Sequence, residues 1–396
     1  MKKNLYYFSG MLLLALAQWS LLRNVLSFYG VEGAGLYYLY ISILTPFYVL
    51  LGGGFRFYSQ NQNSVLDDMI RFRWLNMCII LLSSGVLALT TDRITLFLLA
   101  FSQKFIDFSL ESSQGLKNKT SRDTDTTLIS LVIVNLILIS SQYFSENLRN
   151  ANLINIEIVL PIVIIAFAWM MLPKAMLRKF TYTYDVKKLL SVFNKYTYVY
   201  ASIGIPALII ALIALVPRLS IEFLIDSFAL GVFGTYMYLY IIAKIINQSL
   251  IVTLISKQID AYKIINIGVF NALTLGLIAV AVSLFFHEEI ISIIFGDKLA
   301  EFSYLLPIFL VLFIIESINS TLEYLIVYMQ SSVDFLIYNS YLLIMSVLLC
   351  PSLIYLFGFD GAIYYLFSLA SIKFYIYLKS FLTCYQKARA LCENSN

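Results

Sequence analysis

The chain has 396 residues, of which 60% are hydrophobic and only 13% are charged, with a formal net charge of +4. Soluble domains carry roughly twice this share of charged residues, so the composition excludes an ordinary water-exposed fold. Four cysteines without paired spacing and a single histidine give no sign of a disulfide framework, a metal site or histidine-based catalysis. We expect an all-α membrane protein with no metal, no cofactor and no nucleic-acid partner, because a spanning helix needs about 20 apolar residues and this chain has room for many.

Hydrophobic runs between polar breaks predict twelve spanning helices. In chain order they are 5–28, 36–56, 74–91, 94–115, 127–144, 152–172, 196–216, 229–255, 264–286, 303–328, 335–357 and 360–383. The connections between them are short. No extramembrane segment is therefore expected to fold as a catalytic domain, and any function belongs to the helical bundle.

Lysine and arginine are distributed unequally between the two sides of this arrangement. Of the 27 Lys and Arg residues, nineteen lie on the same side as the N-terminus, at the termini, in loops or at the ends of spans. The other side receives four, which are Arg93, Arg149, Arg218 and Lys298. Because cytoplasmic loops carry the excess of positive charge, both termini are predicted to be cytoplasmic.

The chain is predicted to contain an N-terminal six-helix half (1–172), a basic cytoplasmic linker (173–195) and a C-terminal six-helix half with a short tail (196–396). The halves share a stretch in which an arginine precedes a glycine by 12 or 13 residues and a tyrosine-rich helix start follows. These stretches run from Arg23 to Gly35 and from Arg218 to Gly231. They predict a parallel repeat with a site between the halves, and two coincidentally similar hairpins are the alternative.

Charged residues inside spans are candidate functional positions, because a charge at the bilayer centre costs about 2.5–3.5 kcal/mol on insertion scales. Lys104, Asp107 and Glu111 in the fourth span are spaced by three and four residues, which places them on one helical face. This face either lines a wet lumen or is neutralised by a Lys104–Asp107 pair.

The tenth span, the counterpart of the fourth, repeats this spacing with Glu316, Asn319 and Glu323. Acidic residues in a low dielectric could carry a proton or bind a cation such as sodium, and so couple transport to an ion gradient. The alternative is that each carboxylate pairs with a lysine.

Two arginines, Arg23 and Arg218, lie near the non-cytoplasmic ends of their predicted spans. Arginine near a helix end commonly extends to the interface, and a role in an outer gate is the other interpretation. Glu157, near the same end of the sixth span, is the plainest partner for either arginine.

Several stretches, taken in order, resemble polysaccharide exporters of the multidrug/oligosaccharidyl-lipid/polysaccharide (MOP) superfamily. They are Arg23 to Gly35, Gly52 to Gly54, Lys104 to Asp107, Gln114 to Asp125, Ile294 to Lys298 and Phe357 to Ala362. Pro217 to Gly231 in particular resembles the Wzx-type O-antigen flippases. The resemblance covers nearly the whole chain and implies a MATE-like bundle of two six-helix halves.

The resemblance also implies a function. Such a protein would move an oligosaccharide linked to undecaprenyl pyrophosphate, an O-antigen or related repeat unit, across the bacterial inner membrane by alternating access. Proton or sodium coupling, membrane lipid, an O-antigen polymerase and a chain-length regulator are the further partners it implies.

The pyrophosphate of this substrate is anionic, and a cationic group in a desolvated cavity would attract it. Lys244, midway in the eighth span, and Lys373, midway in the twelfth, are the best candidates for the contact, with Lys104, Arg23 and Arg218 as further lumen candidates. The alternative for both lysines is pairing with Glu316 or Glu323.

Two other classes compete with a flippase. A MATE-like drug or cation antiporter commonly uses an acidic residue in the first span, and 5–28 contains none. An O-antigen polymerase or membrane glycosyltransferase usually carries a large periplasmic loop or an acidic pair in the first outer loop. That loop, 29–35, contains only Glu32, so a transporter is expected rather than an enzyme.

Overall fold

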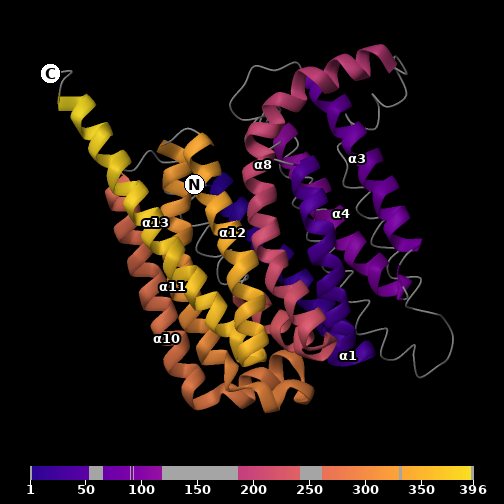
Figure 1. Cartoon of the computed structure of the whole chain (residues 1–396), viewed down its shortest axis with the longest axis vertical. Helices are drawn as coiled ribbons and strands as arrows, with labels where there is room; N and C mark the ends of the chain where they lie inside the picture. Colours follow the sequence, from indigo (N-terminus) through magenta and orange to yellow (C-terminus); the bar gives the residue numbers. More distant parts are fainter. Residues whose placement is uncertain are drawn as a thin grey trace. The chain divides into compact units, whose positions relative to one another are not determined.

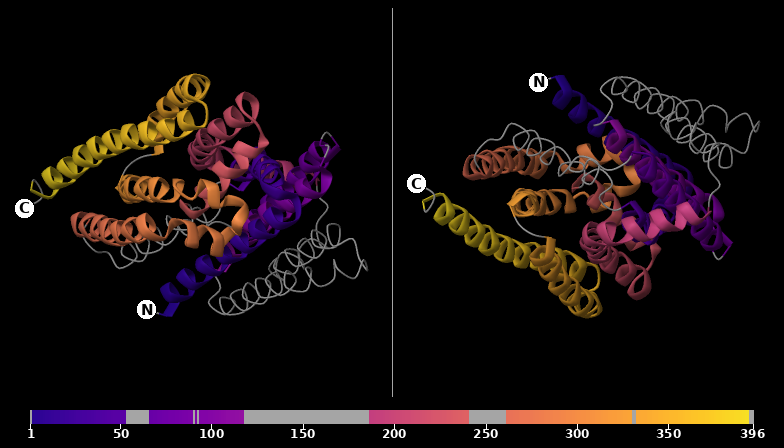
Figure 2. Two further views of the ribbon diagram at one scale, coloured as in Figure 1. Left: turned by 90° about the horizontal axis from the view of Figure 1, so that it is seen from below. Right: turned by 90° about the horizontal axis from the view of Figure 1, so that it is seen from above.

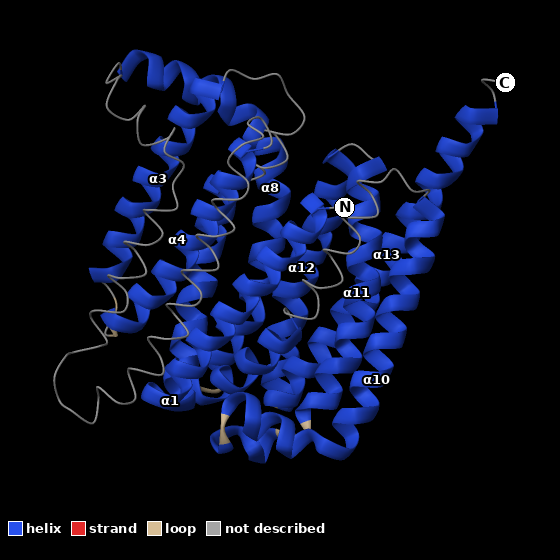
Figure 3. Cartoon of the chain, turned by 180° about the vertical axis from the view of Figure 1, so that it is seen from behind, coloured by secondary structure: helices blue, strands red, loops and turns tan. Residues whose placement is uncertain are grey.

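The structure is a computed structural model of the chain and describes residues 2–52, 66–89, 91, 93–117, 186–240, 261–329 and 332–393. The elements labelled in Figure 1 are α1 (Lys2–Gly52), α3 (Leu66–Leu89), α4 (Ile94–Lys117), α8 (Val186–Leu224), α10 (Ala261–Phe295), the 3-10 turn η1 (Asp297–Phe302), α11 (Leu305–Met329), α12 (Ser332–Phe357) and α13 (Phe359–Glu393). A further helix occupies 227–240. Regular structure in the described residues is helical throughout (Figure 3), which confirms the all-α fold class.

Six of the described helical stretches are long and apolar enough to cross a membrane. They are Leu21–Leu51, Gly204–Leu224, Lys263–Phe295, Leu305–Glu323, Leu336–Phe357 and Phe359–Thr383. Large apolar side chains such as Phe270, Leu277 and Leu348 are exposed on their outer faces, where lipid would cover them. The chain is therefore a multi-pass membrane protein. The count of twelve spans and the cytoplasmic termini stay predictions, because 127–144, 152–172 and 241–255 lie outside the described residues.

The first two predicted spans form one run of helix, α1, that is broken at Gly30. This residue has φ +74° and ψ −171°, a backbone conformation that residues with a side chain rarely adopt. The break falls between the predicted spans 5–28 and 36–56, so the chain turns at one glycine rather than through a loop.

The helix that contains the seventh predicted span, 196–216, is longer than that span, because α8 begins at Val186, within the predicted linker 173–195. It ends at Leu224, and the helix at 227–240 begins two residues beyond Ile225. Asp226 caps that helix, since its Oδ1 accepts a hydrogen bond of 2.7 Å from the Ala229 N–H.

Internal contacts divide the chain into two compact units, Met1–Gly35 with Val216–Asn396 and Leu36–Leu215. In the first unit α11 packs against α10 and α13, and α13 also packs against α12, as Figures 1 and 2 show. In the second unit α3 packs against α4. The predicted repeat of 1–172 and 196–396 stays a prediction.

Within the first unit, α1 and the helix at 227–240 meet at two glycines. A Cβ on Gly35 would lie 1.9 Å from the carbonyl oxygen of Ser227, and a Cβ on Gly231 would lie 2.0 Å from that of Val31. Each carbonyl belongs to the residue four positions before the opposite glycine, so the contacts are reciprocal. Neither glycine has room for a side chain.

Candidate functional site: a polar network between α11, α12 and α13

The middle of α11 is a polar stretch in an otherwise apolar helix. Its buried polar residues, each no more than 6% exposed as a whole residue, are Glu316, Ser317, Asn319, Ser320 and Thr321. Glu323, one turn further on, is half-buried. Polar groups at this depth need partners from neighbouring helices, and α11 is positioned for this because it packs against both α10 and α13.

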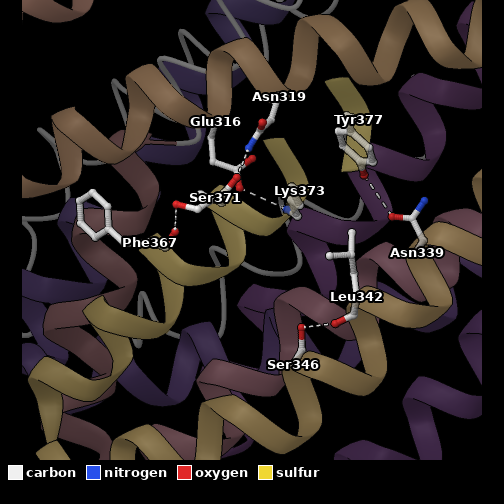
Figure 4. Close-up of polar contacts among 10 residues, drawn as sticks. Glu316, Asn319, Asn339, Leu342, Ser346, Phe367, Ser371, Lys373 and Tyr377 are labelled. Atoms are coloured by element: carbon white, nitrogen blue, oxygen red, sulfur yellow. Dashed lines mark hydrogen bonds and ion pairs between the residues drawn. The ribbon is translucent and has the colours of Figure 1, made fainter. Parts of the chain in front are cut away.

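Glu316 forms an ion pair with Lys373 of α13. The Lys373 Nζ lies 3.3 Å from the Glu316 Oε1, and the two side chains are 18% and 8% exposed (Figure 4). The pair leaves no net charge among the apolar helices, which makes burial of both groups tolerable. Of the two interpretations of Lys373, pairing with Glu316 is present in the structure, and contact with substrate stays a prediction.

A tyrosine from a third helix completes the surroundings of Glu316. The Tyr240 hydroxyl lies close enough to Glu316 and Glu323 for both carboxylates to act on it electrostatically. The Tyr240 ring belongs to an apolar cluster with Phe313 and Ile314. The carboxylate of Glu316 is therefore paired with an ammonium group and lies near a phenol, with hydrophobic side chains beside them.

Asn319 ties α11 to the backbone of α13. Its Nδ2 donates to the Ala370 carbonyl oxygen at 2.9 Å, as Figure 4 shows for the side chain. Its Oδ1 is buried and has no hydrogen-bond partner among the described residues. A buried amide oxygen without a donor is unusual, because the lost hydration is not repaid.

A second hydrogen bond joins α13 to α12. The Tyr377 hydroxyl, one turn beyond Lys373, donates to the Asn339 Oδ1 at 3.2 Å, and both side chains are at most 2% exposed (Figure 4). Asn339 was not among the residues predicted from the sequence. The available signal was a lone amide in the apolar run 335–357, which in lipid requires a partner.

In the second unit the predicted stripe of α4 is only partly described. Tyr37 donates a hydrogen bond to the Gln103 side chain, which is buried next to the half-buried Lys104. Asp107 and Glu111 belong to α4, but their side chains lie outside the described part of the chain. A Lys104–Asp107 pair and a lumen-facing stripe both stay open.

The other site residues predicted from the sequence either do not belong to this network or lie outside the described residues. Arg23 is exposed on α1, with its guanidinium 5.9 Å from the centre of the Trp19 ring. Arg218 is half-buried in α8. Lys244 and Glu157 lie outside the described residues, so their roles stay predictions.

The network can exchange charged partners. A carboxylate, an ammonium group and a phenol lie together, so an anion could replace the carboxylate at Lys373, or a proton or cation could replace the ammonium at Glu316. Where the structure describes the chain, no three His, Cys, Asp or Glu side chains are grouped so as to hold a metal ion.

Comparisons with known proteins identify the fold. No family profile and no curated protein matches the chain. The structure is similar to the lipid II flippase MurJ in an inward closed conformation, with a TM-score of 0.58 and 15% identity over 93% of this chain and 88% of that chain.

Two multidrug-type transporters are also similar. The eukaryotic MATE transporter AtDTX14 gives a TM-score of 0.51 at 12% identity, over 98% of both chains. An inward-facing multidrug resistance MATE family transporter of the MOP superfamily gives 0.50 at 11% identity, over 98% of this chain and 96% of that chain. At these identities the similarity shows the fold alone, which this chain shares with a lipid II flippase and with MATE transporters.

Proposed function

We propose that this protein is a flippase that moves an oligosaccharide linked to undecaprenyl pyrophosphate, an O-antigen or related repeat unit, across the bacterial inner membrane. The observation that carries the proposal is the Lys373–Glu316 pair, which places an accessible cation inside an apolar bundle. The MOP-type fold supports a transport function, and one protein with this fold is named as a lipid II flippase.

Burial of the Lys373–Glu316 ion pair costs free energy, and a functional role explains why the pair is present. An apolar pair of similar volume would hold α11 to α13 at least as well, because burying two charges costs much of what their attraction returns. Lys373 keeps 18% of its side chain exposed, so an anion can reach it. In our proposal a pyrophosphate oxygen takes the place of the Glu316 carboxylate as the partner of Lys373.

Glu316 then requires another positive partner. A proton or a sodium ion is the simplest candidate, and the Tyr240 hydroxyl beside the carboxylate can donate to it in the meantime. This exchange would couple translocation of the anion to movement of an ion. Glu323, Asp107, Glu111 and Glu157 are further candidates for ion coupling or charge pairing.

The other lysine and arginine candidates have secondary roles in the proposed transport. Lys244 is the second proposed pyrophosphate contact, and Lys104, Arg23 and Arg218 are candidates for the lumen and its outer end. The prenyl tail stays in lipid while rocking of the two six-helix halves exposes the sugar outside. A polymerase and a chain-length regulator would then receive the unit.

The test is complementation in a strain that lacks the native protein, with surface polysaccharide as the measurement. Lys373→Met should abolish surface polymer, and Lys373→Arg should retain part of it because the charge is kept. Lys379→Met is the matched control, since Lys379 is exposed on the same helix. Normal polymer from a Lys244→Ala/Lys373→Ala double variant would contradict the pyrophosphate role.

A drug or cation antiporter is the second candidate, because two of the similar structures are MATE transporters and Glu316 offers a carboxylate to a cation. The absence of an acidic residue from 5–28 argues against it. Such an antiporter would lose efflux of organic cations on Glu316→Gln and tolerate Lys373→Met. If the protein is a flippase, Lys373→Met should reduce surface polysaccharide more than Glu316→Gln does.

A further inference from the structure

The turn between α10 and α11 contacts two segments that are far away in the sequence. It comprises Gly296, η1 and Ser303, here called the strap (296–303). Both its ends are anchored, since the Gly296 N–H donates to the Ser292 carbonyl oxygen and the Ser303 hydroxyl is hydrogen-bonded to His287 Nδ1 at 2.9 Å. The strap is therefore an ordered element with a defined position on the ends of α10 and α11 (Figure 1).

The strap contacts α1 through Lys298. The Lys298 Nζ lies 3.4 Å from the Leu26 carbonyl oxygen and 3.5 Å from that of Ser27. These carbonyls belong to the last turn of α1 before the break at Gly30, where the helix dipole presents its negative end. The distances are long and Lys298 is exposed, so this contact is weak and easily reversed.

The strap also contacts the helix at 227–240, through Phe302. The Phe302 carbonyl oxygen accepts a hydrogen bond of 2.7 Å from the Tyr236 hydroxyl, and its ring lies 5.8 Å from the Phe228 ring between centroids. Tyr236 is fully buried, so this is the stronger of the two attachments.

The strap contacts α1 just before its break at Gly30 and also contacts the helix at 227–240. The part of α1 just after the break crosses that same helix at Gly35 and Gly231. The break at Gly30 and the strap are both predicted to lie on the side opposite the cytoplasm. We propose that the strap holds the outer crossing of α1 and the 227–240 helix closed, and that it must detach before this end can open. The proposal rests on an alternating-access transporter but not on any particular substrate.

Access to the crossing tests the proposal without any substrate. Val31→Cys, at a site 6% exposed in the crossing, serves as the reporter in a chain whose four cysteines are replaced by serine. A membrane-impermeant maleimide is applied to right-side-out and inverted vesicles. Tyr236→Phe should speed labelling from the outer face about five-fold, as expected for loss of one buried hydrogen bond. Lys298→Met should speed it about two-fold, because the contact is long and exposed.

Two matched controls separate the strap from general loosening. Tyr304→Phe removes a hydroxyl from an exposed ring just beyond the strap, and Glu301→Gln removes an exposed charge within it. Both should label at the rate of the reporter alone. Equal labelling of Tyr236→Phe and Tyr304→Phe would overturn the proposal.

A second experiment fixes the strap to the 227–240 helix with a reversible cross-link. Phe228→Cys and Phe302→Cys are joined by a short bis-methanethiosulfonate linker, which reduction cleaves. We expect surface polysaccharide export to stop on cross-linking and return on reduction, with labelling of the crossing suppressed in parallel. Full export with the linker in place would overturn the proposal. Absence of export by the uncross-linked chain, together with normal labelling changes, would instead contradict the proposed function alone.

Discussion

Gly35 and Gly231 lie at one helix crossing, each with its Cα against the carbonyl oxygen of the residue four positions before the other. A Cβ at Gly35 would be 1.9 Å from the Ser227 oxygen, and one at Gly231 would be 2.0 Å from the Val31 oxygen. These glycines close the two stretches that sequence comparison pairs with each other. The interpretation of those stretches as equivalent parts of a repeat stays a prediction.

Substitution of either glycine by alanine should separate the two helices. Because the opposing atoms are backbone, no side chain can move aside, and we expect a loss of about 1–3 kcal/mol in the free energy of unfolding, as for overpacked cores. Thermal unfolding in detergent measures this, and the accessibility of Val31→Cys should rise in the same variants.

Gly85→Ala is the control for the crossing. Gly85 lies in α3, and a Cβ there would meet nothing within 4 Å. Alanine should stabilise that helix by up to about 1 kcal/mol. Equal melting temperatures for Gly85→Ala and Gly231→Ala would mean that the crossing does not constrain the fold.

Hydropathy predicted the helices of the described chain well where apolar runs end sharply. α11 and α12 begin and end within three residues of the spans predicted at 303–328 and 335–357. α8 and α13 extend beyond their spans, because Val186 to Lys195 and Cys384 to Glu393 are polar enough to leave the membrane and still helical. Hydropathy detects lipid contact rather than helix formation, so it could not place these ends.

The candidate site was predicted in part. The spacing of Glu316, Asn319 and Glu323 placed them together on α11, and pairing of Lys373 with a tenth-span acid was one stated alternative. Which acid it meets depends on the register of α13 against α11, and hydropathy carries no such information. Tyr240 and Asn339 were missed as partners because neither is charged, and uncharged polar residues leave little trace in a hydropathy profile.

The Lys373–Glu316 pair should show strong coupling in a double-variant cycle. Lys373→Met leaves a buried carboxylate without its counter-ion, and we expect a loss of about 3 kcal/mol, the lower end of the range for buried pairs, since Lys373 is 18% exposed. Lys373→Met/Glu316→Gln should recover much of this loss in thermal unfolding, while export stays absent. Additive losses would show that the two charges do not interact.

The Tyr377–Asn339 hydrogen bond should stabilise the contact of α12 with α13. Tyr377→Phe removes the donor to a fully buried Oδ1, and we expect a loss of about 1–2 kcal/mol. Tyr375→Phe is the matched control, because Tyr375 is 67% exposed on the same helix and should be nearly neutral. Thermal unfolding of the two variants distinguishes the buried hydroxyl from the exposed one, and the idea fails if both melt alike.

Alanine substitution should destabilise the protein to different extents at Gly358 and Gly361, which lie at the junction of α12 and α13, because the two positions require glycine for different reasons. Gly358 has φ +60° with open space around it, so alanine there meets backbone strain of about 1–2 kcal/mol. A Cβ at Gly361 would lie 2.1 Å from the Leu353 carbonyl oxygen, which forces α13 away from α12. We expect Gly361→Ala to lower the melting temperature in detergent more than Gly358→Ala does. In a chain that also carries Asn339→Cys, Gly361→Ala should increase the rate at which a maleimide labels that cysteine. The reverse order would mean that backbone strain, not helix contact, selects glycine in the stretch from Phe357 to Ala362.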